Sequence, residues 1–250
     1  MHWEISKGWR AVPDLRLVDT RSRAFVGGTL ANDVLHRLRE DIVSCTLRPG
    51  ERLRFETLRE IYGASFSTLR EALSRLSSEN LVAAEGQRGF SVAPISRADL
   101  LDLTDARVII ERECIARSIR HGDKKWRSAL LSAFHRLDRI EADEVGQLVD
   151  SGEWEALHSA FHEALVACSG SAILMEIRAG LFERARRYRR ISTMVRRLPR
   201  KKSAEHRAMM EAALAGDIET AQNLIATHIR RTADNVLQAM FPPLEETAGT

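Results

Sequence analysis

Cysteine, tyrosine and proline are scarce in this sequence, and each scarcity narrows the class of protein. The chain has three cysteines, two tyrosines and six prolines among 250 residues. The cysteines are odd in number, widely spaced and without a CxxC pair, so they indicate free thiols in a reducing cytoplasm and no redox or zinc motif. The low proline and tyrosine content, with abundant arginine, alanine, leucine and glutamate, favours helix over strand.

Long apolar runs are also lacking. No stretch approaches the ~18 apolar residues that a membrane span needs. Residues 1–28 contain no apolar core typical of a secretory signal. We therefore expect a cytoplasmic protein with no membrane partner. The net charge of +3 and the pI near 9.0 permit nucleic-acid binding but are weak evidence for it.

The first half of the chain alternates short helical patterns with turns. Residues 1–28 lack steady periodicity, and we expect a partly disordered extension there. An apolar stripe follows, then a Pro-Gly turn and two short helical segments at about 56–62 and 67–79, the second with Ser65 as a candidate N-cap. Two short apolar strands around a glycine-containing turn come next. This order predicts a winged helix-turn-helix over residues 29–95.

The remainder of the chain carries helical periodicity only. No strand signal appears after Val92, and residues 243–250 read as a tail. The sequence therefore predicts a mainly α protein, with an all-α antiparallel helical bundle over residues 96–242. The expected helices are about 97–120, 123–142, 153–169, 171–193, 203–215 and 217–240.

Several short strings resemble those of the GntR family of bacterial transcription regulators. In the first half, the strings that resemble its DNA-binding domain are Arg48–Leu53, Tyr62–Ser65, Thr68–Leu76, Asn80–Val82 and Arg88–Val92. In the second half, those that resemble its FadR-type ligand domain (FCD) are Arg107 with Glu111, Phe161-His162, Glu205-His206, Gly216-Asp217 and His228. The Arg-Glu-Ala-Leu string at 70–73 is also similar to the carbon-starvation-induced regulator branch.

The resemblance implies a recognition helix whose N-terminal residues meet base edges in double-stranded DNA. Arg70 can bond guanine or grip phosphate. Many relatives place an arginine where this chain has Phe66, which cannot donate, so that contact is lost or replaced by apolar packing on a thymine methyl group. The candidate DNA-binding residues are Ser65, Phe66, Ser67, Thr68, Arg70 and Arg75, with Arg88 and Gly89 at the tip of the wing.

Charge alone does not single out this surface, because residues 29–95 carry nine basic and nine acidic side chains. Arg70 and Arg75 can equally be solvated charges on an amphipathic helix. If the module does bind DNA, its neutral balance predicts that two joined modules are needed, hence a homodimer on a short palindrome. The densest basic run, Arg184 to Lys202, reads either as a second DNA patch or as a solvated helix face and loop.

Histidines suggest a metal site in the second half. His158 and His162 share one helix face, and His206 and His228 lie 22 residues apart on two later helices. Antiparallel neighbours would bring them level, where imidazoles bind Zn²⁺, or alternatively Ni²⁺, with positions open for an anion. Buried core histidines are the plainer interpretation. The resemblance implies metal ligands, with His158 where many relatives have aspartate, so that the metal keeps its full charge and attracts a carboxylate.

A carboxylate effector needs cationic partners. Arg107 lies on an apolar stripe of its predicted helix, where it either pairs with Glu111 or clamps an effector carboxylate. Arg184 and Tyr188 fall at helical spacing with Ile173 and Ile177, and are two further candidate effector-binding residues.

Two other classes of function compete with a regulator. A His-x-x-x-His pair is typical of metalloproteases, but Ser159 follows His158 where those enzymes have a glutamate base. A helical metal-binding or ligand-binding protein without DNA binding is the other alternative. We predict a non-enzymatic DNA-binding regulator, a repressor, that associates with the nucleoid when bound to DNA and responds to a small organic acid.

Overall fold

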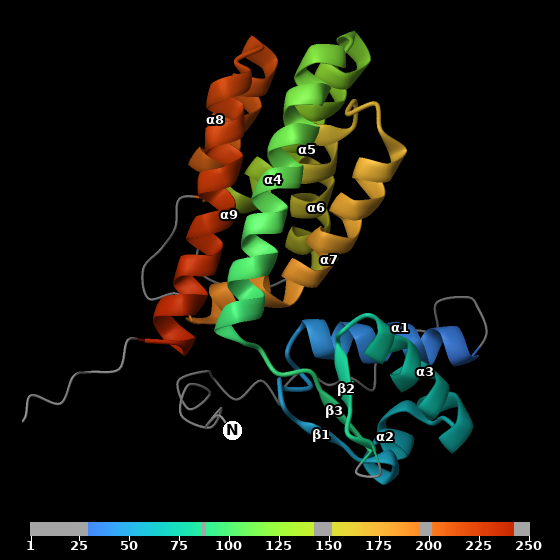
Figure 1. Ribbon diagram of the computed structural model, residues 1–250. Helices are drawn as coiled ribbons and strands as arrows, with labels where there is room; N and C mark the ends of the chain where they lie inside the picture. Colours follow the sequence, from blue (N-terminus) through green and yellow to red (C-terminus); the bar gives the residue numbers. More distant parts are fainter. Residues whose placement is uncertain (1–29, 87–88, 143–151, 196–201, 243–250) are drawn as a thin grey trace, which may run out of the picture. The chain divides into compact units, whose positions relative to one another are not determined.

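The computed structural model describes residues 30–86, 89–142, 152–195 and 202–242, and the chain divides into two compact units between Asp99 and Leu100 (Figure 1). The expected N-terminal extension and C-terminal tail lie outside the described residues. The elements of the first unit are α1 (Leu30–Val43), β1 (Arg52–Leu53), α2 (Phe55–Tyr62), α3 (Phe66–Ser78), β2 (Val82–Ala84) and β3 (Phe90–Val92).

The core of the first unit forms where α1 packs against α3. Val34 and Leu38 on α1, and Leu69 and Leu73 on α3, are completely buried. Their spacing of four residues places each pair on one helix face, so that α1 and α3 each turn an apolar face toward the other. Gly63 ends α2 with a φ of 63°, a left-handed conformation that glycine adopts without steric cost.

The strands form one antiparallel sheet in the order β1-β3-β2. Leu53 pairs with Phe90 across β1 and β3, and Val82 pairs with Val92 across β2 and β3. The hairpin of β2 and β3 was expected, but β1 was not. At two residues, β1 is too short to show alternation, and only its pairing with β3 defines it as a strand.

The second unit is a bundle of helices, which confirms the predicted mainly α fold class. In the bundle, α5 packs against α6 and α8, and α9 packs against α7 and α8. None of the described helices has the length and apolarity required to cross a bilayer. The bundle comprises α4 (Arg97–His121), α5 (Lys124–Ala142), α6 (Gly152–Val166), α7 (Ala172–Val195), α8 (Lys202–Ala215) and α9 (Ile218–Met240) (Figure 1).

Apolar side chains from several helices close the bundle around its centre. Ile115 of α4, Leu130 and Phe134 of α5, and Phe161 and Leu165 of α6 are all almost completely buried. Phe134 and Phe161 meet edge to face, with ring centroids 6.1 Å apart. This packed core holds α6 against α5 and so presents the remaining inner face of α6 to α8 and α9.

Candidate functional site

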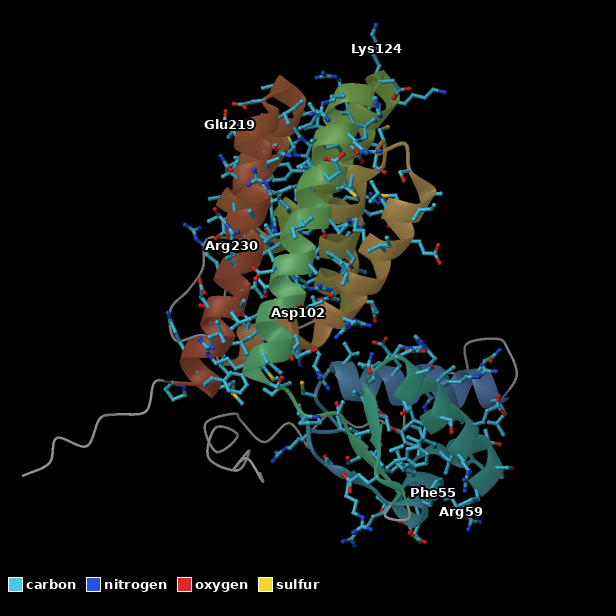
Figure 2. All side chains as sticks on the ribbon, in the orientation of Figure 1. Phe55, Arg59, Asp102, Lys124, Glu219 and Arg230 are labelled. Carbon is cyan, nitrogen blue, oxygen red and sulfur yellow. The ribbon has the colours of Figure 1, made fainter. Side chains whose placement is uncertain are left out.

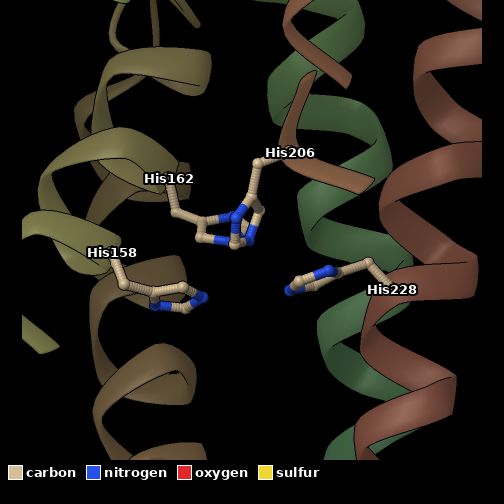
Figure 3. Close-up of side chains that lie close together, drawn as sticks. All are labelled: His158, His162, His206 and His228. Atoms are coloured by element: carbon tan, nitrogen blue, oxygen red, sulfur yellow. The ribbon is translucent and has the colours of Figure 1, made fainter. Parts of the chain in front are cut away.

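Four buried imidazoles converge inside the bundle (Figure 3). His158 and His162 come from α6, His206 from α8 and His228 from α9. One ring nitrogen of each lies within 4.8 Å of one from every other. The structure therefore brings together the four histidines that the sequence singled out. Their side chains point toward one another from three helices, as antiparallel packing requires.

Some ring nitrogens of this histidine cluster lack the hydrogen bonds that buried polar atoms normally make. Both ring nitrogens of His162, Nδ1 of His158 and Nε2 of His206 are buried without a partner. A buried polar atom that has lost its hydrogen bonds to water and gained none in the protein costs about 1–3 kcal/mol of folding free energy. A neutral imidazole has one lone pair, and coordination of a cation would use one from each ring, so the donor set fits a divalent metal that prefers imidazole.

The cluster favours neutral imidazoles. Burial lowers the pKa of His158 and His162 well below the ordinary value of 6.5. The neighbouring imidazoles lower it further, as do Arg189 near His158 and Arg178 near His162. Because only a neutral imidazole has a lone pair to give, both side chains are ready for a metal at neutral pH.

Two carboxylates stand behind the cluster. Nδ1 of His206 lies 2.9 Å from Glu141, and Nδ1 of His228 lies 2.9 Å from Glu205. A carboxylate accepts, so each Nδ1 carries the proton and each Nε2 lone pair is left for the cluster. Trp154 donates from Nε1 to the same Glu141 at 3.1 Å. The sequence offered no signal for Glu141, whereas Glu205 stood beside His206 in a recognised string.

A group of arginines surrounds Phe182 next to the histidines. The guanidinium carbons of Arg107, Arg178 and Arg189 lie 5.2, 5.0 and 4.1 Å from its ring centroid. Glu111 accepts from Arg178 at 2.9 Å and from Arg107 at 3.4 Å. The expected pair of Arg107 and Glu111 therefore exists, with Arg178 as a second cation on the same carboxylate. Sequence reasoning missed Arg178 and Arg189.

Arg107 also has a hydrogen-bond donor that its ion pair with Glu111 does not use. Its Nε is buried without a partner. Burial lowers the pKa of Arg107 to about 10, which still leaves a cation at neutral pH. Arg189 likewise has a buried Nε without a partner, although another nitrogen of its guanidinium donates to Glu155 at 2.7 Å. Both guanidinium groups are thus only partly satisfied, and an anion would complete them.

These two arginines meet at a small cavity within the bundle. Its volume is about 10 Å³, enough for about one water molecule. Tyr188, the other expected effector residue here, is buried and lines the same space. An organic acid would therefore have to open the cavity on entering. The residues that line it are Leu100, Leu103, Thr104, Arg107, Ala185, Tyr188, Arg189, Ile229, Thr232 and Ala233.

The expected inner face of α7 is confirmed near its C-terminal end, where Tyr188 and Ile191 are buried, and is wrong at the earlier positions. Ile173 and Ile177 are 71% and 45% exposed, and Arg184 on the same predicted stripe is exposed as well. The helix instead buries a face that includes Arg178 and Phe182. Apolar periodicity could not reveal this face, because it buries charged side chains whose acidic partners lie on other helices.

The basic run from Arg184 to Lys202 is not one solvated surface in its described part. Arg187 and Arg189 are buried, and the ring of Tyr188 lies 5.8 Å from the guanidinium carbon of Arg187. Residues 196–201 lie outside the described residues. The described part of the run therefore combines an exposed arginine, Arg184, with buried ones that have acidic or aromatic neighbours in the bundle.

The start of α3 has the exposure that a DNA-reading helix needs. Ser65 caps the helix, its Oγ accepting from the backbone N–H of Thr68 at 3.2 Å. The hydroxyls of Ser67 and Thr68 each lie 2.9 Å from the same Oγ. Phe66 and Arg70 are exposed on the outside of this turn. The residues expected to meet base edges therefore form one surface.

Other expected DNA-binding residues differ in their surroundings. Arg75 pairs with Glu71 of the same helix at 3.0 Å, so its charge is partly balanced within α3. Gly89 has a φ of 91°, a conformation suited to glycine at the tip of a wing. Arg88 lies outside the described residues.

Two known families match the chain, one in each unit. Residues 30–92 match the family described as "Bacterial regulatory proteins, gntR family", and residues 102–231 match the family described as "FCD domain". The chain is 36% identical over 211 residues to the HTH-type transcriptional regulator BphR of Paraburkholderia xenovorans, covering 84% of this chain and 86% of that one. It is 35% identical over 208 residues to the HTH-type transcriptional repressor GlaR of Escherichia coli, covering 81% and 94%.

Solved structures resemble the chain over most of its length. The E. coli protein McbR/YncC has a TM-score of 0.66 at 20% identity, covering 85% of this chain and 99% of that one, which is a likeness of fold. A GntR transcriptional regulator from Rhodococcus sp. RHA1 also has a TM-score of 0.66, at 25% identity and with coverage of 84% and 98%. Both comparisons extend over most of this chain, including residues of both units.

Proposed function

The chain belongs to the GntR family of bacterial transcription regulators with an FCD domain, and we propose that it is a repressor whose operator affinity is set by an organic acid at a metal-containing pocket. The observation that carries this proposal is the convergence of four buried imidazoles in the unit that follows the winged helix. The name of the relative GlaR, a repressor, supports the sign of regulation. Because the relatives of this chain are transcription regulators, we also propose that it has no catalytic activity and acts in the cytoplasm.

In this proposal residues 29–95 bind a short palindromic operator as part of a homodimer. The exposed turn at the start of α3 enters the major groove, and the wing contacts the neighbouring phosphates or minor groove. Arg70 is the main polar base contact, because it is exposed at this end of α3. Arg75, already paired with Glu71, contributes less. Two heads act together since one neutral head gains little from phosphate attraction.

Residues 96–242 hold the metal and the effector. His158, His162, His206 and His228 are the proposed ligands, and imidazole donors favour Zn²⁺, with Ni²⁺ as the alternative. A divalent ion held there would supply the positive charge that attracts a carboxylate. Glu141 and Glu205 keep His206 and His228 oriented with Nε2 toward the cluster. These acceptors make two of the ligands rigid before any ion arrives.

The effector would bind beside the cluster at Arg107 and Arg189, each with a guanidinium nitrogen still unpaired. Tyr188 lines the same cavity. Leu100 and Thr104 line it as well and belong to the first turns of α4, directly after the last residue of the first unit. An acid that binds one position of these turns better than another would change the pose of the DNA-binding unit, and hence operator affinity.

Selection of DNA tests the regulatory proposal. Random duplexes are enriched on the full chain loaded with Zn²⁺, and the enriched duplex is then titrated with and without candidate carboxylic acids. Arg70→Ala should lose about tenfold or more in specific affinity, since a bidentate base contact contributes about 1–3 kcal/mol. Arg136→Ala, an exposed arginine of α5, is the matched control and should bind normally. Full specific affinity in Arg70→Ala would show that the reading helix is misplaced.

Metal content tests the histidine cluster separately. The double variant His162→Ala with His206→Ala should be purified with little Zn²⁺ or Ni²⁺ after exposure to either ion. His135→Ala removes an exposed histidine of α5 and should keep the content of the unaltered protein. An unchanged metal content in the double variant would refute the ligand assignment while leaving DNA binding open.

A further inference from the structure

We propose that Phe66 reads the C5-methyl group of a thymine in the operator. This inference rests on the proposed DNA binding and adds to it the chemistry of one base contact. Phe66 is the first residue of α3 and is 50% exposed. Among the large apolar side chains that are exposed in the described parts of the chain, it is the one aromatic ring. Its position places it at the end of the helix that meets base edges.

Two other aromatic rings hold Phe66 in place. Phe55, the first residue of α2, lies with its ring centroid 4.2 Å from that of Phe66 at an interplanar angle of 34°. Phe55 in turn packs edge-on against Phe90 of β3, with centroids 6.2 Å apart. Figure 2 marks Phe55 at the start of α2. The row of rings therefore connects the two helices and the sheet, and the exposed ring of Phe66 is positioned before DNA arrives.

A ring positioned in advance binds at low cost, because little side-chain freedom remains to be lost. The contact with Phe55 also explains how Phe66 can remain half-exposed to solvent. One part of its surface is covered by Phe55, and the rest faces outward beside Ser67 and Arg70. Such an arrangement suits a contact that is completed by an apolar group of a partner.

The chemistry of the groove identifies that group. A phenyl ring neither donates nor accepts a conventional hydrogen bond, and the negative face of its π system repels phosphate oxygens. The base edges of the major groove otherwise carry hydrogen-bonding atoms, and the thymine methyl is their distinctive apolar group. Phe66 is therefore matched to thymine, with Arg70 one helical turn further on available for a neighbouring polar contact.

The test uses duplexes enriched from a random library on the full chain. We expect an invariant thymine in each half-site. Each thymine of the enriched duplex is then replaced singly by deoxyuridine, which removes the methyl and keeps every hydrogen-bonding group. One replacement should weaken binding about fourfold, the factor for one buried methylene, and its symmetric pair together about 15-fold. The other replacements should have smaller effects.

A protein variant ties the methyl to this ring. Phe66→Ala should bind more weakly and should no longer distinguish thymine from deoxyuridine at the sensitive position. Ile173→Ala, which shortens an exposed apolar side chain in the other unit, should keep the full discrimination. Specific binding that is indifferent to every deoxyuridine, or discrimination that survives in Phe66→Ala, would overturn the inference alone. Failure to enrich any duplex would overturn the proposed DNA binding as well.

Discussion

The carboxylate of Glu141 lies 2.9 Å from Nδ1 of His206, although 65 positions separate the two residues in the sequence. Both side chains are buried, and Glu141 also accepts from Trp154. The contact determines which ring nitrogen of His206 faces the cluster. It also places a negative charge behind the proposed ligands, which offsets part of the metal charge that an all-histidine set would leave exposed to an effector.

Substitution of Glu141 by glutamine should weaken metal binding without removing a ligand. The amide keeps the shape of the carboxylate but loses its charge, so His206 becomes a poorer donor. We expect Zn²⁺ affinity to fall about 10–100-fold, as is usual for such outer partners. Competition with a fluorescent chelator measures the change. Glu163→Gln, at an exposed position of α6, is the control. Equal affinity in the two variants would contradict the role given to Glu141.

Acid should destabilise the metal-free protein. The pKa values of His158 and His162 lie well below 6.5 in the folded chain and return toward that value on unfolding. Between the two pKa values the unfolded chain binds more protons, so this contribution to stability is complete above about pH 6.5 and is lost as the pH falls below it. Melting temperatures recorded in chelator between about pH 5 and pH 8 should show the decline.

The same experiment has an internal control. His162→Asn removes one of the depressed groups and should flatten the dependence of melting temperature on pH. His135→Asn changes an exposed imidazole and should leave the slope as it is. An identical slope in all three proteins would mean that the cluster does not govern the acid response.

Removal of the charge on Glu111 should strongly destabilise the bundle. Glu111 is 1% exposed and accepts from both Arg107 and Arg178, so Glu111→Gln leaves two buried guanidinium groups without their anion. Breaking such a buried pair costs about 3–5 kcal/mol. Urea unfolding followed by tryptophan fluorescence reports on the bundle through Trp126 and Trp154.

An exposed ion pair provides the comparison for Glu111. The side chain of Glu71 is 58% exposed in its pair with Arg75. Glu71→Gln should therefore change the unfolding free energy by less than about 1 kcal/mol. A similar decrease of the unfolding free energy in both variants would show that the contacts of Glu111 with Arg107 and Arg178 do not stabilise the bundle.

The cap of α3 predicts a smaller effect in the DNA-binding unit. Ser65→Ala removes the oxygen that accepts from the backbone N–H of Thr68 and should cost about 1 kcal/mol, whereas Ser65→Gly should cost a few tenths. Amide hydrogen exchange in α3 measures this locally. Ser74→Ala, in the exposed middle of the helix, should be neutral or slightly stabilising. Faster exchange in Ser74→Ala than in Ser65→Ala would contradict the capping role.

Sequence reasoning succeeded where the signal was local. The predicted helix at about 123–142 is observed as α5, and the expected N-cap Ser65 accepts its hydrogen bond. His158 and His162 share a helix face because four residues make about one helical turn. It failed for the first half of α7, where Ile173 and Ile177 are exposed and the buried side chains include Arg178.

The amino-acid order by itself determined the helix spans, the winged helix outline and the candidate ligands, since periodicity, capping and spacing act over a few residues. Only the tertiary structure decided that Glu141 supports His206 and that Arg178 joins His162 to Glu111. Those choices depend on which distant helices become neighbours. A charge can stay buried only where packing delivers its partner, and no local pattern encodes that meeting.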